Sequence, residues 1–160
     1  MKIEIVPVMT EDKASLVLAK ELIIEYANSL DFDLDFQNFD HEVANLPGEY
    51  SEPEGRLYTA LLDNKPAGCV ALRKIDRDIC EMKRLYVRPE FRGKGIGKAL
   101  AEKVIADARV IDYRRMRLDT VLSMTEAIAL YKSLGFVEIE KYRLNPLPHA
   151  VFLELDLTSG

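Results

Sequence analysis

The sequence predicts a mixed α/β (α+β) fold, in which helices cover both faces of one mostly antiparallel seven-stranded sheet. Seven short segments have the apolar patterns of strands, and other segments have apolar residues at helical spacing. The early strands are joined by short turns and should be antiparallel, whereas one later pair is joined by a long helix and must be parallel. A chain of 160 residues with 48% hydrophobic residues can bury one core, which predicts a single domain over residues 1–160.

The N-terminal segment predicts an edge strand followed by a helix. Residues 2–8 alternate apolar and polar side chains loosely, as an edge strand does. Thr10 followed by the acids Glu11 and Asp12 is typical of a helix start. The residues that then recur at helical spacing, and so form one apolar face, are Leu16, Ala19, Leu22, Ile23 and Tyr26.

The middle of the chain predicts an irregular segment and then three strands. Residues 29–55 mix acidic and aromatic side chains and end in a stretch rich in Pro and Gly. We therefore expect loops around one short helix at residues 39–45. Strand-like runs follow at residues 56–62, 67–74 and 79–87 with short polar turns between them, and we expect them to form an antiparallel meander.

The C-terminal third predicts two helices and three further strands. The first helix is expected to begin near Gly95, and a strand at residues 117–120 follows it. Ser123 with Glu126 three residues later has the pattern of a capping box at the start of the second helix. Gly135 is placed to end that helix. The last two strands are expected at residues 136–139 and 150–157.

The composition excludes some classes of partner. A net charge of −5 argues against nucleic acid, because phosphate binding needs an extended basic surface. No apolar run approaches the length needed to cross a bilayer, and the N-terminus lacks the pattern of a secretory signal, so we expect no membrane partner. Cys69 and Cys80 are not clustered as in a disulfide framework or a zinc site, and we expect both to be reduced and buried. These points predict a cytoplasmic protein and leave its oligomeric state open, a homodimer included.

A glycine-rich turn separates the strand at residues 79–87 from the helix that follows. Its sequence is Arg92-Gly93-Lys94-Gly95-Ile96-Gly97-Lys98. Because glycines have no Cβ atoms, several backbone N–H groups can point into one small volume at the helix N-terminus. Residues 83–98 also hold six basic residues and one acidic residue, a local net charge of +5. The turn therefore predicts a site for a small, strongly anionic ligand.

Two other phosphate-binding motifs fit this turn poorly. A Walker A loop needs a glycine and a Ser or Thr where this chain has Arg92 and Ala99. A dinucleotide-binding fingerprint needs its third glycine three residues after the second, but Gly97 follows Gly95 by two. The remaining alternative is a purely structural strand-turn-helix, which uses its glycines only to turn.

The segment from Cys80 to Gly97, with Arg-x-x-Gly-x-Gly after a strand and a proline, resembles the GNAT N-acetyltransferase superfamily. A second block, from Ala127 to Phe136, resembles that superfamily as well, and the likeness extends over roughly residues 56–157. The resemblance implies acetyl-CoA as cosubstrate, no metal, and a parallel strand pair that splays apart. The pantetheine arm would then pair with the exposed edge of one strand.

The resemblance also implies which residues bind the cofactor. The backbone N–H groups of Leu85 and Val87 are expected to bind pantetheine, and those of residues 93–98 the pyrophosphate. Met124 stands where many family members have an asparagine, which leaves one polar contact to the cofactor in doubt. The implied cofactor-binding residues are Leu85, Tyr86, Val87, Arg92, Gly93, Lys94, Gly95, Ile96, Gly97 and Lys98.

Acetyl transfer from a thioester to an amine needs three groups: an oxyanion donor, a proton donor for the thiolate and a base for the amine. The N–H of Leu85 is the candidate oxyanion donor. Tyr131 matches the proton donor of the family, although it also lies on the inner face of its helix and can be a packing residue. Glu81 is the candidate base, with an ion pair to the nearby Lys83 or Arg84 as the alternative.

The acceptor is the least constrained part of the prediction. Acidic and aromatic residues alternate over residues 31–42, which fits a cationic amine with an apolar body or a solvated acidic loop. Tyr26, Asp31 and Asn145 are the candidate substrate-binding residues. We expect the primary amine of a small molecule; the alternatives are a protein lysine or N-terminus, and a non-catalytic sensor of acyl-CoA.

Overall fold

The computed structural model describes residues 1–34 and 38–158. Its strands are β1 (Ile3–Pro7), β2 (Arg56–Leu62), β3 (Lys65–Lys74), β4 (Ile79–Val87), β5 (Arg115–Val121), β6 (Val137–Ile139) and β7 (Ala150–Asp156). Its α-helices are α1 (Lys13–Ser29), α2 (Phe39–Ala44), α3 (Ile96–Ile111) and α4 (Thr125–Ser133). Short 3₁₀ helices lie at Gly48–Tyr50 and Pro89–Phe91.

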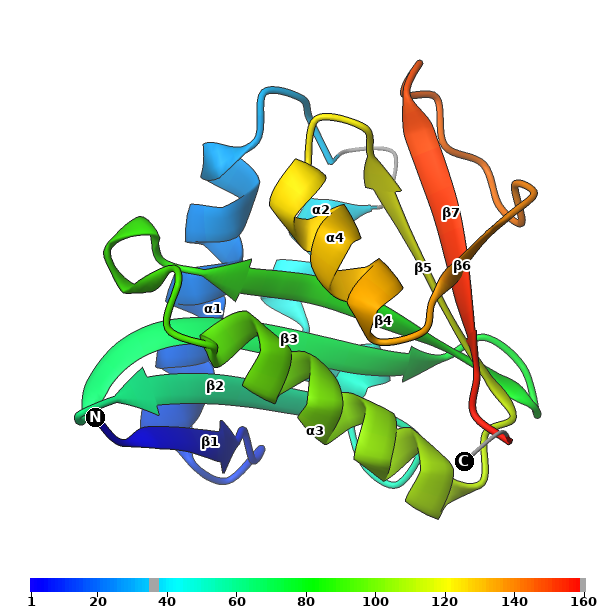
Figure 1. Ribbon diagram of the computed structural model, residues 1–160. Coiled ribbons are helices and arrows are strands. Elements are labelled where there is room, and N and C mark those ends of the chain that lie inside the picture. The colour runs from blue at the N-terminus through cyan, green and yellow to red at the C-terminus, as the bar shows by residue number, and fades with distance from the viewer. Residues whose placement is uncertain (35–37, 159–160) are drawn as a thin grey trace.

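The seven strands form one mixed sheet, as predicted. Their order is β1-β2-β3-β4-β5-β7-β6. The neighbouring strands are antiparallel except for β4 and β5, which are parallel because α3 connects them. In Figure 1, α3 and α4 lie on the near face of the sheet, and α1 and α2 lie behind it.

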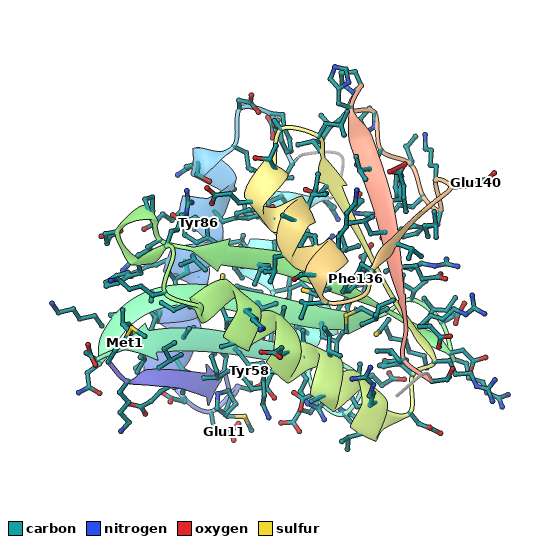
Figure 2. The ribbon with its side chains drawn as sticks, in the orientation of Figure 1. Met1, Glu11, Tyr58, Tyr86, Phe136 and Glu140 are labelled. Atoms are coloured by element: carbon teal, nitrogen blue, oxygen red, sulfur yellow. The ribbon has the colours of Figure 1, made fainter. Side chains whose placement is uncertain are left out.

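Apolar side chains fill the space on both faces of the sheet. On the near face, Leu100 and Val104 of α3 belong to the same buried cluster as Leu118 of β5 and Leu153 of β7. Figure 2 shows Tyr58 beneath α3 and Phe136 beside the end of α4, where both join this core. On the far face, a second cluster forms between α1 and the strands β2 to β4, and it includes Leu22, Ile23, Leu57, Cys69 and Ala71. Burial on both faces holds the sheet between two helical layers.

Most of the predicted elements are confirmed, but the start of α4 is not. The capping box predicted for Ser123 and Glu126 is wrong, because the helix is preceded by Met124 and has no side-chain cap. The Met124 N–H donates to the Val121 carbonyl oxygen at 2.9 Å, and this turn places the first helical residue after Met124. Gly135 ends the helix as predicted, with a left-handed φ of 104°.

Both cysteines have the environment that the sequence predicts. Cys69 on β3 and Cys80 on β4 are free and buried. Burial raises the pKa of each thiol to about 12, so neither carries charge near neutral pH. Among residues 1–34 and 38–158, the helices lack the length and apolar character that a membrane span requires.

Candidate active site

The parallel strands β4 and β5 separate after their first three residues. They are paired only from Ile79 opposite Arg115 to Glu81 opposite Arg117. Beyond Glu81, β4 remains paired with β3 and β5 remains paired with β7, so each strand has one edge without a strand neighbour. The two arrows diverge in Figure 1, and α4 lies in front of the space between them. The splayed pair that the sequence predicts is therefore confirmed.

The free edge of β4 presents the N–H groups of alternate residues. The Arg88 N–H donates to the Ala67 carbonyl oxygen on the β3 side at 2.8 Å. Because neighbouring residues of a strand direct their N–H groups to opposite edges, those of Leu85 and Val87 face the gap. A backbone N–H group inside a protein needs a hydrogen-bond partner. This edge can therefore accept an extended ligand as a strand would.

A groove of about 860 Å³ begins at this edge and runs to the start of α3. It lies between the end of β4 and the first turn of α4. The glycine-rich turn forms one end of the groove, where Gly93 and Gly95 have left-handed φ values of 79° and 85°. Of the implied cofactor-binding residues, Lys94 lies outside the groove, and those that line it are Leu85, Tyr86, Val87, Arg92, Gly93, Gly95, Ile96, Gly97 and Lys98.

The N-terminus of α3 has the properties of an anion site. The first backbone hydrogen bond of the helix runs from the Ala99 N–H to the Gly95 carbonyl oxygen, at 3.0 Å. The N–H groups before Ala99 have no partner within the helix and point toward its N-terminal end. The helix has no side-chain cap to occupy them. Together with Arg92 and Lys98 on the groove wall, these donors suit a pyrophosphate.

The basic residues of the window 83–98 do not all face one anion site, in contrast to the sequence-based prediction. Arg84 is bound by Glu42 of α2, at 2.7 and 2.8 Å. Arg88 is bound by Glu25 of α1, at 3.1 Å. The Tyr86 hydroxyl also donates to Glu25, at 2.6 Å, and Figure 2 shows Tyr86 beside α1. Strand alternation and a bulge in β4 therefore direct part of the window to the α1 and α2 face.

A narrow cavity of about 50 Å³ lies between the diverging strands, next to the groove. We call it the acetyl cavity. Tyr26 and Leu85 line both the cavity and the groove, so the two spaces share a wall. Met124 also lines both and contributes a thioether instead of the amide that many GNAT members have there. Tyr131 and Asn145 line the acetyl cavity as well, so the structure brings four predicted site residues together.

Tyr131 lies in the wall of the acetyl cavity and is almost fully buried. Its ring packs against Phe136, with 5.7 Å between the ring centroids. Burial raises the pKa of its hydroxyl above the ordinary value, because the phenolate would lose its hydration. The hydroxyl therefore keeps its proton at neutral pH. This protonation state is the one that a proton donor requires.

The Glu81 carboxylate lies at the point where the strands separate, but it does not line the groove or the acetyl cavity. It is completely buried and pairs with Arg73 at 2.7 Å and with Arg143 at 3.4 Å. The Tyr142 hydroxyl donates to it as well. Burial alone would raise the pKa of Glu81, but the surrounding cations lower it. The geometry thus favours an ion-pair role, in which Arg73 and Arg143 join the expected Lys83 while Arg84 pairs with Glu42 instead, and the role of base stays a prediction.

Asp119 is a site residue that the sequence analysis did not identify. It lies on β5, lines the acetyl cavity, and accepts hydrogen bonds from Arg143 at 2.9 Å and Asn145 at 3.0 Å. Lys83 of β4 lines the same cavity. Asp119 belongs to no recognisable motif, and Lys83 was counted only as part of the basic window, because the two strands meet here only through the fold. The divergence of β4 and β5 is the signal that would have identified them.

The acidic segment lies farther from the gap than expected. Asp31 is exposed and lines a separate, open hollow on the outer side of α1 and α2. Among the described residues of this segment, only the apolar Phe32 and Leu34 line the acetyl cavity, together with the preceding Leu30. Residues 35–37 of the predicted acidic segment, which include Asp35 and Phe36, lie outside the described residues. The structure therefore separates Asp31 from Tyr26 and Asn145.

Comparison with known proteins identifies a family and several similar proteins. The sequence model of the acetyltransferase (GNAT) family matches residues 20–136. An uncharacterized N-acetyltransferase of Schizosaccharomyces pombe is 40% identical, over 87% of this chain and 86% of that protein. Human N-acetylaspartate synthetase is 39% identical, over 59% of this chain and 32% of its own length. A GNAT family acetyltransferase of Elizabethkingia anophelis, solved with acetyl-CoA bound, has a TM-score of 0.69 and 21% identity, over 96% of this chain and 97% of that one.

Proposed function

Because the chain belongs to the acetyltransferase (GNAT) family, we propose that it transfers an acetyl group from acetyl-CoA to the primary amine of a small molecule. The observation that carries this proposal is the unpaired edge of β4, which runs from the acetyl cavity to the anion site of α3. A pantetheine arm ending in a pyrophosphate has the shape and hydrogen-bonding groups that this edge and turn require. Acetyl-CoA supplies the acetyl group as a thioester; no metal is part of the proposal.

The residues of the acetyl cavity have the roles that acyl transfer needs. The Leu85 N–H, on the free edge of β4, donates to the carbonyl oxygen as that oxygen gains negative charge. The Tyr131 hydroxyl, whose pKa is raised by burial, gives a proton to the departing sulfur. Asp119 lines the same cavity and is placed beside the amine. It is a second candidate, besides Glu81, to receive the amine's proton.

Two observations support a small-molecule acceptor over a protein. The acetyl cavity is narrow, with a volume of about 50 Å³, and its lining includes Leu30, Phe32, Asn145 and Leu147. A lysine side chain that a protein presents would reach the site more easily through an open groove. One relative, N-acetylaspartate synthetase, has by its name a small amine-bearing acceptor.

The free cysteines support a cytoplasmic location.

A screen of amines tests the proposal. The protein is incubated with acetyl-CoA and a library of amines, short lysine-containing peptides and amino-terminal peptides, and free thiol release is followed. Acetylation of a small amine at a rate above that of every peptide is the expected result. Faster acetylation of peptides would favour the protein acceptor. CoA binding without transfer to any amine or peptide would favour the acyl-CoA sensor.

A further inference from the structure

The loop at residues 140–149, which connects β6 to β7, is held against both of the diverging strands. Its Tyr142 hydroxyl donates to Glu81 of β4. The Arg143 guanidinium lies between two carboxylates, at 3.4 Å from that of Glu81 and at 2.9 Å from that of Asp119 on β5. These contacts fix the loop at the point where β4 and β5 separate.

Asn145 of this loop uses both ends of its amide within the protein. Its Nδ2 donates to Asp119 Oδ2 at 3.0 Å, and its Oδ1 accepts from the Leu147 N–H at 3.0 Å. The residue is 8% exposed, and both Asn145 and Leu147 line the acetyl cavity. The geometry therefore favours a role for Asn145 in fixing the Asp119 carboxylate; its predicted role in binding the acceptor stays a prediction.

The Asp119 carboxylate can still accept further hydrogen bonds. A carboxylate has about four lone-pair sites, and Arg143 and Asn145 occupy one site on each oxygen of Asp119. Asp119 lines the acetyl cavity, whereas Glu81 is completely buried and lines neither this cavity nor the groove. Of these two carboxylates, Asp119 is therefore the one that an amine in the cavity can reach.

Asp119 and Tyr131 reach the acetyl cavity from opposite faces of the sheet. Leu118 belongs to the core beneath α3 and α4, and successive side chains of a strand point to opposite faces. The Asp119 side chain is therefore on the face that α1 covers, whereas Tyr131 comes from α4 on the near face. This arrangement keeps an amine at Asp119 apart from a thiolate that leaves beside Tyr131.

We propose that Asp119 receives the proton of the acceptor's amine, and that Asn145 is the positioning residue that holds the Asp119 carboxylate toward the acetyl cavity. This inference rests on the proposed acetyl transfer and adds its base. In the step, the amine nitrogen forms a bond to the acetyl carbonyl carbon, and the C–S bond of acetyl-CoA breaks. The amine's proton goes to Asp119, the Tyr131 hydroxyl gives its proton to the sulfur, and water returns both groups to their starting states.

Three variants separate the position of the carboxylate from the stability of the loop. Asp119→Asn keeps the shape of the side chain and removes its charge. Asn145→Asp keeps an oxygen for the Leu147 N–H, loses the donor to Asp119 and places two carboxylates together. The double variant, Asp119→Asn with Asn145→Asp, again has one amide beside one carboxylate, so the hydrogen bond can form with donor and acceptor exchanged. The double variant then differs from the wild-type protein mainly in where the negative charge lies.

The unfolding temperature, the CoA affinity, and the kcat and KM for an amine acceptor are measured for each variant at neutral pH. Leu144→Ala is the matched control, because Leu144 lies in the same loop and is 76% exposed. It should match the wild-type protein throughout. Asn145→Asp should unfold about 2–4 °C lower or more, the effect of one lost hydrogen bond in a domain of this size. The double variant should regain this loss.

Turnover should not follow stability. In Asp119→Asn and in the double variant, kcat should fall about 10²-fold or more, the usual scale of general-base catalysis, while CoA affinity stays within a few-fold of wild type. Asn145→Asp should lose turnover as well, because the Asp119 carboxylate is displaced. A merely structural role of Asn145 predicts instead that the double variant regains turnover together with stability.

Wild-type kcat in Asp119→Asn or in Asn145→Asp, or recovery of turnover in the double variant, would overturn the proposal while leaving acetyl transfer intact. Stabilisation by CoA shows which variants are folded. If Asn145→Asp alone does not fold, Asp119→Asn and the double variant still distinguish the two outcomes. Failure of the wild-type protein to acetylate any amine would instead contradict the proposed function itself.

Discussion

Glu81 and Arg117 are the last residues of β4 and β5 that lie opposite each other before the two strands separate. Their side chains have different partners, because Glu81 pairs with Arg73 and Arg143 whereas Arg117 pairs with Glu154 at 2.8 Å. Arg117 is thus tied to the β5–β7 half of the sheet alone, whereas Glu81 is tied to both halves, through Arg73 of β3 and Arg143 of the loop before β7. The gap that follows is held open by the pairing of β4 with β3 and of β5 with β7.

The gap between β4 and β5 should make the protein select ligands that carry a pantetheine arm. Acetyl-CoA and CoA are expected to raise the unfolding temperature, because a ligand that binds only the folded state stabilises it. ATP and NAD carry phosphates but no pantetheine arm, so they leave the free edge of β4 unpaired. Thermal unfolding with each ligand at equal concentration checks this difference. Stabilisation by ATP equal to that by CoA would contradict it.

Gly97→Glu should abolish the stabilisation by CoA, because it places an anion where the groove meets the α3 N-terminus. The fold should survive. A Cβ atom at this position would lie 3.6 Å from the nearest atoms of Leu130 and Val87, an ordinary contact. An acidic side chain in the first helical turn is also favourable for the helix itself.

Gly97→Ala is the matched control for this experiment, since it adds the Cβ atom without the charge. Both variants should unfold near the temperature of the wild-type protein when no ligand is present. Titration with CoA should then show binding by Gly97→Ala and none by Gly97→Glu. If Gly97→Glu bound CoA with wild-type affinity, the pyrophosphate site would lie elsewhere.

Tyr131→Phe separates catalysis from binding. The change keeps the ring that packs against Phe136 and removes only the hydroxyl. Turnover with a good acceptor should fall about 10²-fold or more, the usual scale of general-acid catalysis. CoA affinity should stay within a few-fold of wild type.

Tyr113→Phe is a suitable control, because Tyr113 is also buried but its hydroxyl donates to the Glu54 carbonyl oxygen at the opposite end of β5. Its turnover should match that of the wild-type protein. Steady-state rates from pH 6 to 9 provide the comparison. Wild-type turnover of Tyr131→Phe throughout this range would show that water supplies the proton and that Tyr131 is a packing residue.

Glu81→Gln should destabilise the protein in a pH-dependent way. The folded protein lowers the pKa of Glu81 below its ordinary value of 4.5, so the ionised carboxylate contributes stability above that pH and loses it as the pH falls. At pH 7 the variant should lose about 3 kcal/mol or more of unfolding free energy, because Arg73 and Arg143 lose the buried carboxylate that they share. The difference from wild type should narrow in acid.

Urea unfolding at pH 7 and at pH 3 measures this difference, with the exposed Glu138→Gln as control. The control should stay within about 0.5 kcal/mol of wild type at both values. A Glu81→Gln difference that does not change with pH would show that the carboxylate's charge is not coupled to folding. The kcat of the folded variant also tests Glu81 as the base, which would require a large loss of turnover.

The antiparallel meander, the parallel strand pair and the glycine-rich turn could be predicted because their signals are local. A run of strand residues, a proline and a glycine-rich turn lie within residues 80–97, and this continuity fixes how strand, turn and helix meet. The start of α4 could not be fixed in the same way. Ser123 and Glu126 have the spacing of a capping box, but the turn between Val121 and Met124 decides where the helix begins.

The cavity of about 360 Å³ that Arg73, Lys83 and Arg143 line could not be predicted, because its residues come from separate elements. Arg73, Lys83 and Arg143 converge only when the sheet and the loop before β7 are folded. In the sequence, Lys83 lies in the same basic window as Arg92 and Lys98, which predicts one shared role for all three. The alternation of side chains along β4 and its bulge assign Lys83 to the opposite side of the strand from the pyrophosphate site.

Amide hydrogen exchange with and without CoA tests most directly the claim that the gap between β4 and β5 holds the cofactor. The N–H groups of Leu85 and Val87, together with those of residues 96–98, should exchange more slowly when CoA is bound, because the ligand satisfies donors that the free protein leaves unpaired. The Arg88 N–H, which already donates to Ala67, should change little. Protection elsewhere in the sheet, with no change at Leu85 and Val87, would contradict the account.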